Sequence, residues 1–193
     1  MELAEEYTRN ELDVKIHYDM DPESPREWSN VGKMFCSHRS YNLGDEQFNP
    51  NDFDGWDDVK LYLKEVEDAV IILPLGLYDH GSITMYVGDT HDRWDGGQVG
   101  FIYCTQADID REWNGSIKDA EQYLIGEVKT YDTYLRGDVY GITITNPRNG
   151  DEIENCWGFY GLDYAKEEAN SIADAFVHPH DAAYAKNARI LHG

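Results

Sequence analysis

The chain has 193 residues, with 38 acidic against 16 basic side chains and a formal net charge of -22 at pH 7. Phosphate groups and anionic bilayers repel such a surface, which disfavours direct binding to nucleic acid or to a membrane surface. Hydrophobic residues make up 41% of the chain and aromatic residues 13%, so a core can form and a disordered acidic tail is excluded. The length predicts a single domain over residues 1–193, with 1–11 and 178–193 loosely packed.

The first half of the chain predicts a sheet with one short helix. Leu12, Val14 and Ile16 alternate with polar residues, which is the period of a half-buried strand. Residues 40–54 read as a polar loop, and 55–68 as a short amphipathic helix. Proline cannot donate to a strand ladder, so Pro74 predicts a bend or bulge in the most apolar strand. Predicted strands cover 12–16, 31–36, 69–77, 83–87 and 99–103.

The second half predicts two helices and a hairpin. Apolar residues recur at helical spacing over 116–135, where Ser116 suits the N-cap, and again over 163–176. Two strands, 139–145 and 152–159, flank an Asn-Gly turn that is typical of a hairpin. These elements predict an α+β fold with a mainly antiparallel sheet covered by two or three helices.

Catalytic and metal-binding patterns are weak. His80 next to Asp79 is a candidate general base, and Cys104 or Cys156 a candidate nucleophile, but adjacent strand residues point to opposite faces. The odd number of cysteines and the lack of a Cys-x-x-Cys pair favour buried reduced thiols. We therefore expect no catalytic group, no metal and no cofactor. The alternative metal ligands are Asp89, His91, Asp92 and Asp95, in a loop without the spacing of an EF-hand.

Carboxylates gather along one part of the sequence. Residues 45–68 hold nine of them against two lysines, and Trp56 in this part either covers the core or is an exposed anchor. Glu127 and Asp132 are further candidate contacts, on the polar side of the long helix. Over the whole chain, the net charge of -22 is as large as the phosphate charge carried by roughly 37 Å of duplex DNA. A solvation coat or salt adaptation is the competing explanation. The candidate partner-binding residues are Asp52, Asp54, Asp57, Asp58, Glu65, Asp68, Asp119 and Glu121.

Six further segments occur in consistent order along the chain: Asp21–Trp28, Tyr41–Asp45, Leu73–His80, Trp94–Tyr103, Glu127–Tyr140 and Cys156–Gly161. Together they resemble a family of small proteins encoded by phages and other mobile elements. The resemblance implies no catalytic residue; it implies a bacterial host, where small acidic proteins often inhibit CRISPR or restriction nucleases. We thus expect a cytoplasmic inhibitor that binds the basic groove of a host defence nuclease, such as a Cas effector or restriction enzyme, by nucleic-acid mimicry or steric block. The alternative is a small cytosolic enzyme of unfamiliar type that uses His80 with a nearby carboxylate or cysteine.

Overall fold

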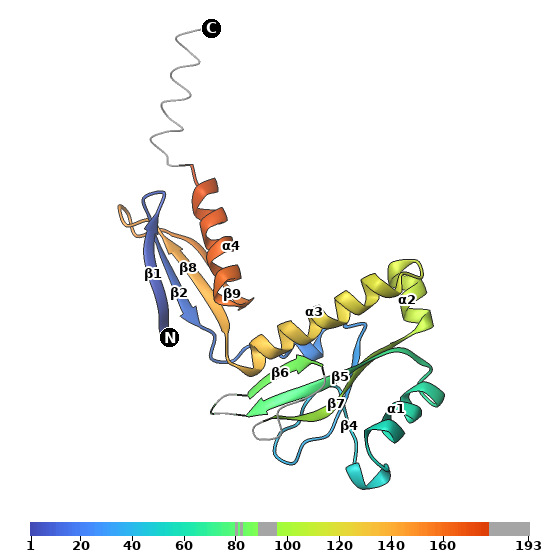
Figure 1. The fold of residues 1–193 in the computed structure, drawn as a ribbon. Coiled ribbons are helices and arrows are strands. Elements are labelled where there is room, and N and C mark those ends of the chain that lie inside the picture. The colour runs from blue at the N-terminus through green and yellow to red at the C-terminus, as the bar shows by residue number, and fades with distance from the viewer. Residues whose placement is uncertain (80, 82, 89–95, 178–193) are drawn as a thin grey trace. The chain divides into compact units, whose positions relative to one another are not determined.

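A computed structural model describes residues 1–79, 81, 83–88 and 96–177, and the chain divides into two compact units (Figure 1). The first unit contains Met1–Asp21 and Asp138–Gly193, and the second contains Pro22–Gly137. Each unit has its own sheet and its own hydrophobic core. The predicted α+β class with mainly antiparallel pairing is confirmed, but the strands form two sheets.

None of the helices within the described ranges has both the length and the apolar character that a membrane span requires.

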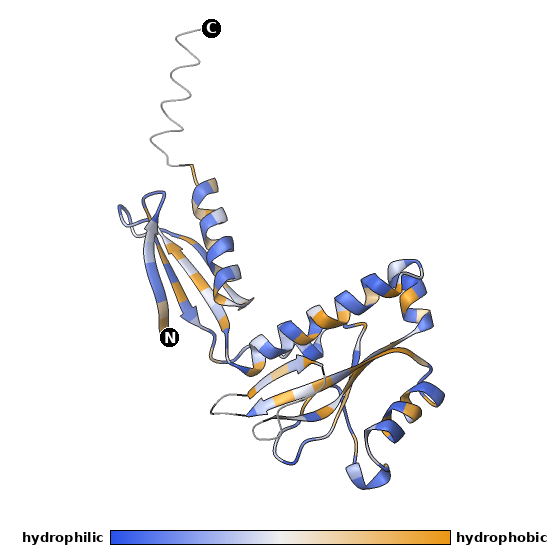
Figure 2. Cartoon of the chain, in the orientation of Figure 1, coloured by the Kyte–Doolittle hydropathy of each residue, from blue (hydrophilic) through white to orange (hydrophobic). Residues whose placement is uncertain are grey.

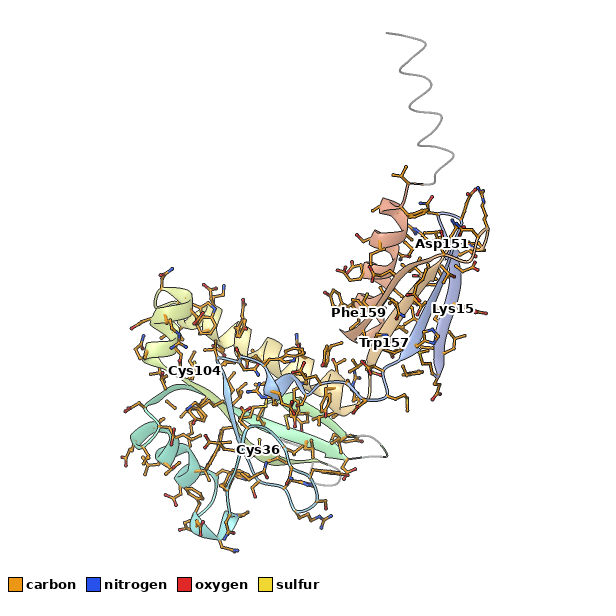
Figure 3. All side chains as sticks on the ribbon, turned by 180° about the vertical axis from the view of Figure 1, so that it is seen from behind. Lys15, Cys36, Cys104, Asp151, Trp157 and Phe159 are labelled. Carbon is orange, nitrogen blue, oxygen red and sulfur yellow. The ribbon has the colours of Figure 1, made fainter. Side chains whose placement is uncertain are left out.

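The first unit is a four-stranded antiparallel sheet with one helix on it. The strand order is β1-β2-β8-β9. Apolar residues of β2 and β8 pack on the α4 face, where Ala165, Ala169 and Ala173 recur every four residues and are buried. On the other face, the ring of His17 stacks on that of Trp157 (Trp157 is labelled in Figure 3). The elements are β1 (Leu3–Arg9), β2 (Leu12–Tyr18), β8 (Val139–Thr145), β9 (Glu152–Tyr160) and α4 (Leu162–Ala175).

The second unit is a five-stranded sheet in the order β4-β3-β7-β5-β6, antiparallel except for the β3–β4 pair. Hydrophobic residues concentrate on β5 and β7, whereas the helices carry mixed surfaces (Figure 2). Its strands are β3 (Lys33–Cys36), β4 (Glu46–Gln47), β5 (Ala69–Asp79), β6 (Ile83–Val87) and β7 (Gly96–Thr105). Its helices are η1 (Pro25–Glu27), η2 (Pro50–Asp52), α1 (Trp56–Glu65), α2 (Gln106–Trp113) and α3 (Ile117–Leu135).

Helices pack on both faces of the five-stranded sheet, α3 on one and α1 on the other (Figure 1). Alternation along β7 explains this, because successive strand residues point to opposite faces. Ile102 and Cys104 belong to the cluster that contains α3, while Phe101 and Tyr103 belong to the cluster that contains α1. We name these the α3 face and the α1 face.

Three elements differ from the sequence prediction. The segment 1–11, expected to pack loosely, forms β1 and pairs with β2. Helix α2 and the two-residue strand β4 were not predicted at all. The expected irregularity around Pro74 is present, since the β5–β7 register shifts between Leu75 and Gly76. The predicted tail, 178–193, lies outside the described residues.

Candidate functional site

Net charge alone marks no site in this molecule. The first unit has 16 acidic and 6 basic residues, and the second has 22 and 10, so the surplus is shared almost equally. What distinguishes one region is how its charges are arranged. Residues 46–59, which we call the acidic segment, contain five carboxylates and neither lysine nor arginine. They are Glu46, Asp52, Asp54, Asp57 and Asp58.

Local turns and caps shape the acidic segment. The Asn49 side chain accepts a hydrogen bond from the Asn51 amide, which caps η2, and Pro50 occupies its first turn. Gly55 has a φ of 90°, a conformation that favours glycine, and α1 starts at the next residue. Asp57 and Asp58 lie in the first turn of α1, where the helix dipole stabilises negative charge. The segment therefore folds as a sharp turn that leads into a helix.

Three aromatic rings of the acidic segment surround an open pocket. Phe48 stacks on Phe35 of the sheet at a centroid distance of 4.7 Å and stands nearly perpendicular to both Phe53 and Trp56, at 86° and 89°. The pocket has a volume of about 230 Å³. Trp56 is 37% exposed, so it partly covers the core and partly forms the pocket wall. The lining residues are Phe48, Pro50, Phe53, Gly55, Trp56 and Val59, which we call the aromatic pocket.

The carboxylates beside the pocket are largely exposed. Asp52, Asp54 and Asp57 are exposed, and Asp58 is half-buried and accepts the Asp54 amide at 3.0 Å. Within the described ranges, no ion pair joins any of these four to a lysine or arginine. Farther along α1, Lys60 and Lys64 add the first positive charges. The acidic segment is thus an aromatic surface with uncompensated negative charge.

The structure brings together only some of the predicted partner-binding residues. Glu65 ends the helix whose first turn holds Asp57 and Asp58, and Asp68 follows it; both are exposed. Asp119 and Glu121 are exposed on α3, which covers the opposite face of the sheet. These two residues do not share a surface with the acidic segment.

Glu127 was predicted as a surface contact, and that prediction is wrong. Its side chain is 6% exposed and pairs with Arg26 at 3.0 Å, and its other oxygen accepts the amides of Val31 and Gly32. Arg26 also forms two hydrogen bonds with Asp45, whose carboxylate accepts the Met34 amide as well. We call Arg26, Asp45 and Glu127 the buried ion network. It fixes η1 and the start of β3 against α3.

Burial alone would lower the pKa of Arg26, but hydrogen bonds and charge from Asp45 and Glu127 outweigh it and raise that pKa. Asp132, the other predicted contact on α3, likewise serves the fold. It accepts the Met85 amide at 2.8 Å and pairs with Arg136 at 3.4 Å, which ties β6 to the helix. Sequence spacing missed these roles because Arg26 is 101 positions from Glu127 and Met85 is 47 positions from Asp132.

The described members of the alternative catalytic set belong to different units. Asp79 is exposed at the end of β5 and accepts a hydrogen bond from the Tyr41 hydroxyl at 3.2 Å. Cys156 belongs to the other unit, and burial together with the charge of Glu154 raises the pKa of its thiol. A raised pKa is the opposite of what a nucleophilic thiolate needs. His80 lies outside the described residues.

The remaining thiols fit the expectation of buried, reduced cysteines. Cys36 and Cys104 are free and buried inside the second unit (Figure 3). Burial raises the pKa of Cys36 to about 12 and that of Cys104 to about 11. Asp89, His91, Asp92 and Asp95, the alternative metal ligands, lie outside the described residues. Among the residues that are described, no cluster of three metal-ligating side chains occurs.

No protein-family model matches the chain, and comparisons with curated proteins and with solved structures gave no match. The resemblance to phage-encoded proteins therefore stays a prediction. Three of the segments that carry it supply Arg26, Asp45 and Glu127 to the buried ion network. Functional inference depends on the geometry of the acidic segment.

Proposed function

We propose that this protein binds, through its acidic segment, a cationic nucleic-acid groove on a host defence nuclease in the bacterial cytoplasm, and inhibits that enzyme by occupying the groove. One observation carries the proposal: the short segment that forms the open aromatic pocket also contains five carboxylates, without a lysine or arginine among them. Like charges held together oppose folding unless an opposite charge relieves them. A basic groove supplies that charge, and complementary fields accelerate association.

The competing explanation, a solvation coat, predicts acidic residues mixed with basic ones. That arrangement is present on α2 and α3. Asp108 pairs with Arg111 at 2.8 Å, and Asp132 pairs with Arg136. The acidic segment lacks such pairs within the described chain, so its charges are used differently from those of the other helices.

The size of the acidic segment favours local occupation of a groove over imitation of a long duplex. Its five carboxylates match the phosphates along roughly 9 Å of duplex, which is about a quarter of a helical turn. A patch of this size replaces a few phosphate contacts and excludes the rest of the nucleic acid by bulk. We therefore favour steric block at a phosphate-binding position.

A cleavage assay tests the proposal. The wild-type protein is incubated with purified CRISPR effectors and restriction enzymes of each type, and cleavage is followed as the molar ratio rises. We expect inhibition of at least one nuclease that is complete near one equivalent, because the inhibitor acts by occupancy. Complete inhibition well below one equivalent would instead indicate an enzyme. Unchanged cleavage by every nuclease in the panel would contradict the proposal.

A matched pair of variants tests whether inhibition depends on the acidic segment or only on the overall net charge. Lysine at Asp52, Asp54 and Asp57 should abolish inhibition. Lysine at Glu2, Asp163 and Glu167, which are exposed in the first unit, changes net charge equally and should leave inhibition intact. Equal losses in both variants would show that overall charge, and not the acidic segment, is responsible.

A further inference from the structure

We propose that the aromatic pocket holds the guanidinium group of one arginine side chain from the partner protein. This inference deepens the proposed function and rests on it for the identity of the partner. The occupant is a single cationic side chain, and the pocket is the anchor point around which the acidic segment makes its weaker contacts.

The arrangement of the rings suits a cation. Phe48 lies 5.4 Å from Phe53 and 6.1 Å from Trp56, measured between ring centroids, and is nearly perpendicular to both. Trp56 also meets Phe101 of β7 at 5.9 Å and 76°. Walls made of rings in different orientations present a negative ring face to an entering cation, as in the aromatic cages of other proteins. Contacts with Phe35 and Phe101 hold two of these rings against the sheet.

The volume of the pocket limits what it can take. Pockets for drug-sized ligands and cofactors measure roughly 300–1,000 Å³. At about 230 Å³ and open to solvent, the aromatic pocket is too small for a nucleotide or a cofactor. One long side chain from a protein surface is the occupant of matching size.

Charge selects a cation over an apolar side chain. Asp52, Asp54, Asp57 and Asp58 alternate with the lining residues along the chain, so a cation in the pocket is close to several carboxylates. The amino terminus of α1 contributes only about half a positive charge at the same place. Four negative charges outweigh it, and the local field favours a cation.

Arginine fits better than lysine. A guanidinium is planar, stacks on aromatic faces and is more weakly hydrated than an ammonium group. The walls are mainly aromatic and offer few acceptors, so an ammonium would lose hydration without replacement. Trp and Arg are also enriched among the residues that dominate binding at protein interfaces. An arginine that otherwise contacts phosphate is available in a nucleic-acid groove.

The test uses the isolated protein and a defined probe, the peptide acetyl-Gly-Arg-Gly-amide. Tryptophan indole N–H signals are followed by NMR during titration, with Trp56 assigned through Trp56→Phe. We expect saturable shifts confined to Trp56 among the five tryptophans. Replacing arginine by citrulline, a neutral analogue of nearly the same shape, should weaken binding about tenfold, and lysine should bind more weakly than arginine. Equal binding of the arginine and citrulline peptides, or no shift at Trp56, would overturn the inference.

Variants give an independent check. Phe53→Leu keeps the wall apolar but removes a ring, and should weaken arginine-peptide binding about tenfold. The matched control is Trp28→Leu, which alters an exposed tryptophan that lines a separate pocket against α3, and it should bind as the wild type does. Equal affinities of Phe53→Leu and the wild type would contradict a cation–π site.

The outcomes also separate this inference from the proposed function. If the peptide does not bind but lysine at Asp52, Asp54 and Asp57 still abolishes nuclease inhibition, the pocket inference fails alone. If the peptide binds the pocket while no nuclease is inhibited, the proposed function fails and the arginine site stands.

Discussion

The two faces of the five-stranded sheet use negative charge in opposite ways. On the α3 face, Asp45 and Glu127 are bonded to Arg26 and to backbone amides, and the core beneath them is mainly aliphatic, with Tyr131 among its buried members. On the α1 face, the packing is largely aromatic, a pocket remains open, and Asp52, Asp54 and Asp57 face solvent. Carboxylates thus serve architecture on one face and are available for recognition on the other.

The largest expected effect is on the α3 face. Arg26→Met removes the cation that is shared by two carboxylates and leaves Glu127 buried without a partner charge. Because breaking a buried pair costs far more than its formation gains, we expect a loss of about 3–5 kcal/mol in the free energy of unfolding. Urea denaturation followed by circular dichroism measures it. Arg111→Met, at an exposed pair on α2, is the control and should change little; equal effects would show that the buried ion network is not structural.

On the α1 face, the helix should contribute through its apolar side and not through its outer surface. Leu63 is fully buried and Leu61 is 49% exposed on the same helix. Leu63→Ala should cost about 2–5 kcal/mol, since it leaves a cavity. Leu61→Ala should change stability by less than about 0.5 kcal/mol. Thermal and urea unfolding of the pair measure the difference, and similar costs would mean that α1 does not pack as described.

Alkaline pH should destabilise the protein through the α3-face cysteines. Cys36 and Cys104 keep their protons in the folded state, with pKa values raised by burial to about 12 and about 11 from an ordinary value of 9. The stability that these two buried thiols contribute is therefore fully present below pH 9. It is lost as the pH rises toward 11 and 12, because the unfolded state loses these protons before the folded state does. Melting temperatures between pH 7 and 11 measure this fall. At pH 8 neither thiol should react with a thiol reagent unless denaturant is present, and rapid reaction of both would refute their burial.

The smallest expected effect on stability is at the acidic segment. Asparagine at Asp52, Asp54 and Asp57 removes three exposed charges that have no cationic partner among the described residues. Relief of repulsion and loss of the favourable helix dipole contact at Asp57 nearly cancel, so unfolding should change by less than about 0.5 kcal/mol. Urea denaturation checks this value. A loss above about 2 kcal/mol would place these residues with Glu127, in a structural role.

Sequence periodicity predicted most elements of the fold. Period-two alternation located β2, and helical spacing located α3 with its cap at Ser116. It missed β1, because the exposed edge strand Leu3–Arg9 shows little alternation. It also missed the division into two sheets, which depends on β2 pairing with β8 across more than a hundred residues.

The candidate site was only half predictable. The acidic composition is visible in the sequence, which also indicates that Trp56 is either a core residue or an exposed anchor. Aromatic residues interleaved with carboxylates over 46–59 are the sequence signal for the pocket, but they do not show that the rings surround an open space. The structural role of Glu127 was not visible, because Arg26 is 101 positions away in the chain. Glu127 is three residues after Leu124 and four before Tyr131, so helical spacing places it beside the apolar stripe of α3, but only the tertiary contact shows that Arg26 of η1 pairs with it.

Association kinetics with an inhibited nuclease test the central claim most directly. The variant with asparagine at Asp52, Asp54 and Asp57 should associate on the order of ten times more slowly than the wild type at low salt, and its rate should depend less on salt. Its stability should match the wild type, so the loss belongs to recognition. Equal association rates with equal salt dependence would show that the acidic segment does not contact the nuclease.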